Sequence, residues 1–224
     1  ESYYNCSPSS SSTTLKIAAA LRAASGLTSL LFSISAVVLS VLFKKYIVPL
    51  QRVVLYYSVS CILTGISKTL NRADYFVENQ STAIFCVWSG FLDYYTSWTT
   101  VLSALSVSWH LCMDVLGRAH GGKCSQRFWL LLVFVFPLTI CWIPFIHLSY
   151  GQSADWAWCT LRRVLEDCTV FTFALVLDYA LWFVPGSILT CAIVVLYATS
   201  VVVVVRKRVH WNPMCHDPDI IKKK

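Results

Sequence analysis

Charged residues are scarce in this sequence. Only 13% of its 224 residues are charged and 57% are hydrophobic, whereas a soluble domain carries about 25% charged residues. The apolar residues also fall in blocks longer than about 18 residues, the length that crosses a bilayer as a helix. We therefore predict an all-α, multi-pass membrane protein embedded in a lipid bilayer. We do not interpret its net charge of +7 as a sign of nucleic-acid binding.

Sequence motifs for catalysis are also lacking. There is no Gly-rich phosphate loop, no His-Glu-x-x-His and no nucleophile elbow. His210, Cys215 and His216 could offer metal ligands, but their spacing fits no standard zinc pattern. Asp93 and Asp178 could suggest an aspartyl-protease pair, but the Gly-x-Gly-Asp context of intramembrane proteases is not present. We expect neither an enzyme nor a cofactor or metal site.

A signal peptide and internal repeats are not recognisable either. The first apolar block exceeds a signal core of about 7–15 residues, and no basic segment precedes it. Because no repeat of about 20–50 residues is found, an inverted-repeat transporter is less favoured. The chain begins at Glu1 rather than Met, and Lys222–Lys224 follow no closing element. We interpret the sequence as a piece of a longer protein.

Five hydrophobic blocks divide the chain. We expect a flexible extracellular segment over 1–15, a transmembrane bundle over 16–208 and a cytoplasmic tail over 209–224. The last block holds about 35 residues and would reach about 50 Å as a helix, so it should tilt or project beyond the membrane. Pro137 and Pro144 should kink the fourth span. The expected spans are 17–43, 48–70, 85–113, 128–147 and 171–205.

Two independent signals predict the orientation. Asn5 and Asn79 each begin an N-glycosylation sequon, and both fall on one side of a five-span chain. The loops of the other side hold about twice as many Lys and Arg residues, which the positive-inside rule places in the cytoplasm. We therefore predict the N-terminus outside and the tail from Arg206 inside. Arg22, near the start of the first span, can extend its charged end to the outer interface.

The third block has an unusual composition for a membrane helix. It carries Cys86 at its outer end, one acid, Asp93, and many Trp, Tyr and small residues. Such a helix needs polar partners, so we expect other helices to surround it. Asp93 lies seven residues after Cys86, about 10 Å further along the helix. Asp93 and Ser97 share a face by their spacing, with Thr100 less closely aligned, and this polar stripe should point into the bundle.

Four cysteines fall on the side that we predict to be oxidising: Cys6, Cys86, Cys159 and Cys168. A disulfide between Cys86 and Cys159 would tie the loop after the fourth span over the mouth of the bundle. The alternatives are unpaired thiols, or Cys168 in place of Cys159.

Several of these residues resemble those of a known family. Cys86, the Trp-Ala-Trp-Cys stretch that ends at Cys159 and the order of the spans are similar to a seven-transmembrane G-protein-coupled receptor over residues 17–208, ending after the fifth of seven helices. Rhodopsin-like receptors carry an Asp/Glu-Arg-Tyr triplet at a position that here begins with His110. That triplet is missing, so the chain does not resemble an ordinary rhodopsin-like receptor.

Softer motifs are more similar to the cyclic-AMP-receptor-like and secretin/adhesion-like group. They are Trp98-Thr99, the Phe-Val-Phe-Pro stretch that ends at Pro137, and Leu181-Trp182 followed by Pro185. The chain departs from the secretin pattern at Thr160, where that group often has Trp.

The resemblance implies a plasma-membrane receptor that binds an extracellular ligand between the outer helix ends and signals to a heterotrimeric G protein. As the residues that would bind such a ligand we predict the two acids within spans, the polar stripe and nearby aromatic residues, namely Asp93, Tyr94, Ser97, Trp98, Asp178 and Trp182. The residues that the resemblance implies for the G-protein-facing surface are Arg118, Arg206, Lys207 and Arg208.

Other interpretations of these residues stay open. Asp93 could equally form a polar lock with Lys68, with a tyrosine or with a helix outside the sequence. The aromatic residues could serve interhelical packing, and the basic run could contact anionic lipid. A channel or transporter subunit, with Asp93 and Asp178 lining the path, is the alternative function. A five-span structural protein is a third.

Overall fold

The fold is described from a computed structural model, which covers residues 12–44, 49–71, 82–117, 123–147, 150–152, 159–161 and 172–211. Four long helices come first along the chain, and a short strand pair follows them. The helices are α1 (Ser12–Leu42), α2 (Pro49–Leu70), α3 (Thr82–Val115) and α4 (Lys123–Trp142). Helix α1 begins before the expected span, so residues 12–15, which we placed in a flexible segment, are helical.

The second half of the chain is less regular than the sequence predicts. After α4 come a 3₁₀ turn, η3 (Ile143–His147), and two strands, β1 (Tyr150–Gln152) and β2 (Cys159–Leu161). The expected fifth span is divided into α5 (Thr172–Asp178), a π-helical turn η4 (Tyr179–Phe183) and α6 (Val184–Trp211). Helix α4 continues through Pro137 and changes to 3₁₀ geometry next to Pro144.

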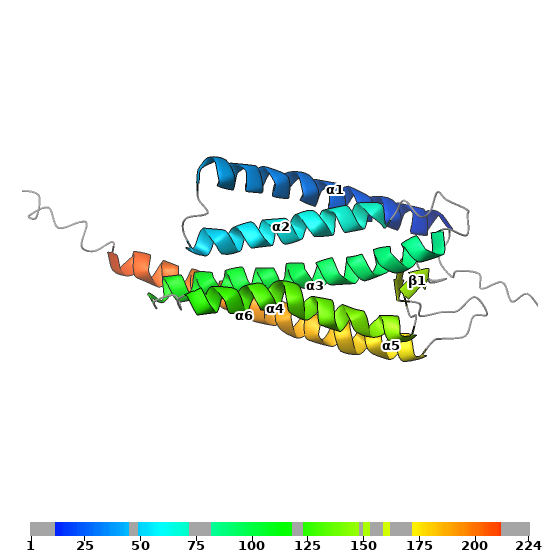
Figure 1. Cartoon of the computed structure of the whole chain (residues 1–224). Coiled ribbons are helices and arrows are strands. Elements are labelled where there is room, and N and C mark those ends of the chain that lie inside the picture. Colours follow the sequence, from blue (N-terminus) through cyan, green and yellow to red (C-terminus); the bar gives the residue numbers. More distant parts are fainter. Residues whose placement is uncertain are drawn as a thin grey trace, which may run out of the picture.

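The helices form a layered bundle with α3 at its centre (Figure 1). Helix α1 packs on α2, α2 packs on α3, and α3 also contacts α4, α6 and both strands. The outer pair approach closely, because a Cβ atom on Gly65 would lie 2.8 Å from the carbonyl oxygen of Gly26. The core lies between α3, α4 and the strands. It is built from Phe91, Trp98, Leu102, Val133, Cys141, Tyr150 and Leu161.

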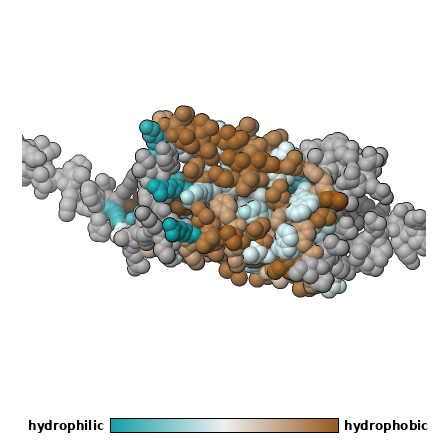
Figure 2. Space-filling view, viewed as in Figure 1, coloured by the Kyte–Doolittle hydropathy of each residue, from teal (hydrophilic) through white to brown (hydrophobic). Residues whose placement is uncertain are grey.

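Four helical segments are long and apolar enough to cross a membrane, which confirms the expected bundle of membrane-spanning helices. They are Ala20–Leu42, Leu50–Leu70, Arg127–Phe145 and Thr172–Lys207. Figure 2 shows hydrophobic residues over the middle of the molecule and strongly hydrophilic ones toward one end. Lys44, Arg127 and Arg206 lie at this end, which we call the basic end. The opposite end carries the strands and is called the disulfide end.

Helix α3 was expected to span as well. It is long enough, but its composition is more polar than that of the four segments that can cross a membrane. Its 34 residues would reach about 51 Å. Its polar side chains are covered by neighbouring helices, since Thr96, Thr99 and Ser103 are almost fully buried. The hydroxyl of Thr64 on α2 donates to the Thr96 carbonyl at 3.0 Å and lies 2.7 Å from the Thr100 hydroxyl. A helix of this composition fits in a membrane only when other helices surround it.

Candidate functional site

The disulfide end is closed by a small antiparallel hairpin. Strand β1 pairs with β2 so that Gln152 lies opposite Cys159, and Cys159 is bonded to Cys86 on α3 with a Cα–Cα distance of 5.2 Å. This confirms the expected Cys86–Cys159 disulfide. All three residues of β2 are buried. The hairpin therefore lies against the end of α3 instead of standing out as an open loop.

A second anchor of the hairpin is Asn71, which follows α2 and is fully buried. Its side-chain nitrogen donates to the carbonyl of Cys159 at 3.0 Å, and its side-chain oxygen accepts from the backbone N–H of Cys159 at 3.0 Å. The hydroxyl of Ser89 donates to the same Asn71 oxygen at 3.4 Å. Asn71 thus pairs with β2 as a neighbouring strand would, satisfying both backbone groups of one residue.

Tyr150 on β1 provides a third anchor. Its hydroxyl donates to the carbonyl of Cys141 on α4 at 2.9 Å. Burial raises the pKa of Tyr150 well above its ordinary value, so the hydroxyl stays protonated and remains a donor. The hairpin is therefore attached to three helices: α2 through Asn71, α3 through Cys86 and α4 through Tyr150.

Asp93 pairs with Arg22 of α1, a contact that the sequence did not predict. The guanidinium of Arg22 donates to Oδ2 of Asp93, and both side chains are largely buried, at 20% and 12% exposure. Oδ1 of Asp93 has no hydrogen-bond partner among the described residues. Of the roles left open for Asp93, the structure shows a polar lock, made with Arg22 instead of Lys68. The Arg22 side chain, expected to extend to the outer interface, instead contacts the central helix.

Asp178 is held from the other side of α3. The hydroxyl of Tyr94 donates to Oδ1 of Asp178, which is 3% exposed at the end of α5. The π-helical turn η4 begins at the next residue and brings Trp182 against α3. The Trp182 ring lies 5.9 Å from the ring of Tyr94 and 5.6 Å from the ring of Trp98, both with edge-to-face geometry. This cluster joins α3 to the last helix.

The residues predicted for ligand binding are thus divided between two sides of α3. Asp93 faces α1, whereas Tyr94 and Trp98 face Asp178 and Trp182. Ser97 lies between these groups and is half-buried. The structure brings four of the six together and separates Asp93 from them.

At the basic end, a lysine links α6 to α3. Nζ of Lys207 on α6 donates to the carbonyl of Val115, the last residue of α3, at 2.6 Å. A cation is favourable there because the carbonyls of the last helical turn carry a partial negative charge. Arg206 is exposed beside it. His110, where rhodopsin-like receptors would have the charged triplet, is buried, with Nδ1 2.7 Å from the carbonyl of Ser106.

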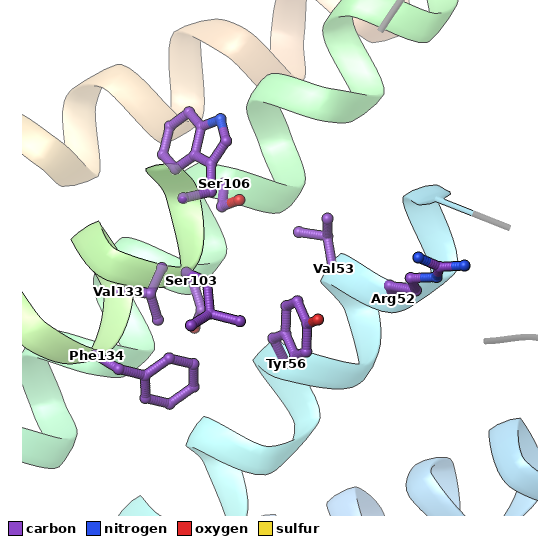
Figure 3. Close-up of a pocket in the computed structure, with 9 residues that line it drawn as sticks. Arg52, Val53, Tyr56, Ser103, Ser106, Val133 and Phe134 are labelled. Atoms are coloured by element: carbon purple, nitrogen blue, oxygen red, sulfur yellow. The ribbon is translucent and has the colours of Figure 1, made fainter. Parts of the chain in front are cut away.

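A small cavity lies in the half of the bundle nearer the basic end, between α2, α3 and α4 (Figure 3). Its volume is about 10 Å³, room for about one water molecule. The residues implied for ligand binding do not line it. The residues that do are Arg52, Val53, Tyr56, Ser103, Ser106, Trp129, Leu130, Val133 and Phe134.

Several predicted site residues lie outside the described part of the chain. They are the sequon residues Asn5 and Asn79 and the basic residue Arg118, together with the side chain of Arg208. Arg22 and Asn71 are the structural partners that the sequence analysis missed. For Arg22 a signal existed, because it and Asp93 are opposite charges at similar distances from the same predicted membrane face. For Asn71 no comparable pattern was available.

No model of a known protein family matches this sequence, and a search of curated proteins finds no match.

Proposed function

We propose that this chain is part of a G-protein-coupled-receptor-like protein of the plasma membrane. It binds an extracellular ligand at the disulfide end and signals to a heterotrimeric G protein at the basic end. The N-terminus lies outside, and further helices complete a bundle of seven. No bond of the ligand is made or broken. The ligand acts by binding one of two conformations more tightly and so shifting their populations.

The anchored hairpin is the observation that carries this proposal. Cys86 and Cys159 join it to the outer end of a polar central helix, and Asn71 holds the same strand from α2. The anchored hairpin lies beside buried acids and aromatic rings. A ligand at this end would therefore find both apolar and hydrogen-bonding contacts. The ring of Tyr94 contacts the ring of Tyr150 in the hairpin and the ring of Trp182, and the Tyr94 hydroxyl donates to Asp178.

The opposite end supports the proposed direction of signalling. Lys207 links the ends of α6 and α3 at this side. The Tyr94–Asp178 contact joins α3 to α5, which continues through η4 into α6, so a change in this contact can alter the separation of the basic ends of α3 and α6. A partner that binds only one separation would then respond to the ligand.

The channel or transporter alternative receives less support. Asp93 is bonded to Arg22 on one side of α3, and Asp178 to Tyr94 on the other. Two carboxylates that line one ion path would face the same space. Here each joins a different pair of helices, as packing contacts do.

The proposal is tested by G-protein binding. The chain is reconstituted in lipid nanodiscs, and its association with a purified heterotrimeric G protein is measured with and without GTPγS. We expect association that GTPγS reverses and that Arg206→Gln with Lys207→Gln weakens. Lys68→Gln, which removes a positive charge in the last turn of α2 at the other end, is the matched control and should leave the association unchanged. Association that is absent, or unaffected by nucleotide, overturns the proposal, as does ion current through the reconstituted chain without ligand.

A further inference from the structure

Two tryptophan side chains lie side by side at the surface of the disulfide end. Trp88 on α3 is 51% exposed, and Trp142, the last residue of α4, is 53% exposed. They come from different helices but contact the same ring, since the ring of Phe145 lies 5.4 Å from that of Trp88 and 5.1 Å from that of Trp142. We call Trp88 and Trp142 the indole pair.

The indole pair is positioned by a second shared contact. The buried ring of Phe91 meets Trp88 edge-to-face at 5.9 Å and Trp142 edge-to-face at 6.1 Å. It also lies 5.2 Å from the ring of Phe145. Edge-to-face contacts stabilise aromatic pairs beyond the burial of their area. The two indoles are therefore held in place on their inner sides, while about half of each stays at the surface.

On α4, Trp142 ends a stripe of exposed apolar side chains. Leu131, Val135 and Leu138 precede it at spacings of four, three and four residues, which place all of them on one face of the helix. The segment Arg127–Phe145 can cross a membrane, and Trp142 lies three residues before its end. The exposed face thus changes from aliphatic to aromatic where the span ends. This is the order that a bilayer favours, with hydrocarbon first and the interface next.

On α3, Trp88 lies at the level that a bilayer interface requires. It is 26 positions before Asp114, about 39 Å along a helix. The hydrocarbon core is about 30 Å thick, and the headgroup layers bring the total to about 40–45 Å. With Asp114 in one headgroup layer, Trp88 therefore lies in the other. An indole suits this layer because it combines a large apolar ring with one N–H donor.

We propose that the indole pair is an anchor that binds the interfacial layer of the phospholipid bilayer at the disulfide end. Its exposed ring faces lie among the glycerol and ester groups of the lipids. Because Phe91 and Phe145 also contact the ring of Tyr150 on β1, at 6.1 and 5.1 Å, the anchor sets the depth at which the hairpin lies. This inference requires only that the bundle lies in a membrane, and it depends neither on a ligand nor on a G protein.

Fluorescence quenching at two depths tests the anchor. The chain is reconstituted in phosphatidylcholine that carries bromine, a quencher of tryptophan emission, either near the glycerol end of its acyl chains or near their methyl ends. The emission of Trp88→Phe with Trp142→Phe is subtracted from that of the unaltered chain, which isolates the signal of the pair. Phenylalanine keeps a ring at each position, and the two single variants place each indole by itself. Trp98→Phe, which removes an indole of α3 that is 3% exposed, is the matched control.

We expect bromine near the glycerol end to quench the signal of the indole pair more strongly than bromine near the methyl ends. The signal of Trp98 should be quenched little at either depth, because other helices enclose it. Stronger quenching by the deep bromine would place the pair in the hydrocarbon core and overturn the proposal. Lack of quenching at both depths would overturn it too. Quenching by aqueous iodide would then place the pair in water, and resistance to iodide would show that a protein surface covers it.

Discussion

Asp93 and Asp114 lie far enough apart on α3 to reach opposite faces of a bilayer. Asp93 and Asp114 are 21 positions apart, about 32 Å along a helix, and the hydrocarbon core is about 30 Å thick. With Asp114 at one boundary, Asp93 therefore lies near the other, where a charge is less costly than at the bilayer centre. Arg22 from α1 lies at the same level and neutralises Asp93. The pair joins α1 to the central helix.

Asp93→Asn should lower the free energy of unfolding by about 3 kcal/mol, because it removes one partner of a largely buried ion pair. The measurement is thermal or SDS unfolding in detergent. Asp114→Asn is the matched control, an exposed acid on the same helix, and should cost less than about 1 kcal/mol. Exchanging the charges with Arg22→Asp and Asp93→Arg should recover part of the loss. Equal effects of Asp93→Asn and Asp114→Asn would contradict an ion pair that stabilises the fold.

The sequence indicated which side chains need a polar partner, but it did not indicate which partner each of them has. An acid on a largely apolar helix was expected to need a polar partner, and Asp93 is paired with Arg22. The choice of Arg22 over Lys68 depends on how α1 is rotated and how deeply it packs on α2, and no pattern in the sequence specifies either. For the same reason, the sequence could not place Asp93 and Asp178 on different sides of α3.

The hairpin is held by two contacts that can be separated, the Cys86–Cys159 disulfide and the Asn71 hydrogen bonds. In a background carrying Cys6→Ser and Cys168→Ser, Cys86→Ser should expose the thiol of Cys159 to a membrane-impermeant maleimide only slowly. Adding Asn71→Ala should speed labelling about thirtyfold, because two hydrogen bonds of about 1 kcal/mol each are lost.

The chain with its disulfide intact serves as the control for this labelling and should not react, with or without Asn71→Ala. Equal rates in Cys86→Ser and in Cys86→Ser with Asn71→Ala would show that Asn71 does not hold the strand.

Helices α1 and α2 approach each other closely at Gly26 and Gly65. Gly65→Val should reduce the free energy of unfolding by about 2 kcal/mol, because its Cβ would meet the Gly26 carbonyl oxygen at 2.8 Å and Cβ of Leu30 at 3.0 Å. Gly186→Val is the control, since a Cβ at Gly186 meets no atom within 4 Å, and it should change stability by less than about 0.5 kcal/mol. Chemical unfolding of both variants in detergent measures the difference. A loss of equal size at both sites would exclude a steric cause.

Long apolar helices were predictable as elements, whereas short irregular ones were not. The boundaries expected for α2 lie within a residue of Pro49–Leu70, because proline is tolerated in a first helical turn and a polar stretch follows Leu70. Strands β1 and β2 have three residues each, so their pairing depends on the disulfide and Asn71 more than on local propensity. The π-helical turn η4 precedes Pro185, and the proline alone predicted only a bend.

On the scale of the whole molecule, composition predicted a membrane bundle. The chain has few charged residues, so its helices have long apolar faces. The structure confirms four such helices, while α3 fits at the centre only because its neighbours cover its hydroxyl groups. Hydropathy treats each helix by itself, so it could not separate a helix facing lipid from one enclosed by others. The exposed faces of α1 and α6 are available to lipid or to further helices.

The orientation of the molecule gives the last prediction. Asn5→Gln and Asn79→Gln should each remove one glycan after expression in a eukaryotic membrane, because both sequons are expected on the outer side with the disulfide. Gel mobility before and after enzymatic deglycosylation measures this. A third sequon, created in the tail by Pro213→Ala with Met214→Ser after Asn212, should stay unmodified because the basic end is expected in the cytoplasm. Glycosylation of the tail in place of Asn5 and Asn79 would show the reverse orientation and place the hairpin in a reducing compartment, where a disulfide does not persist.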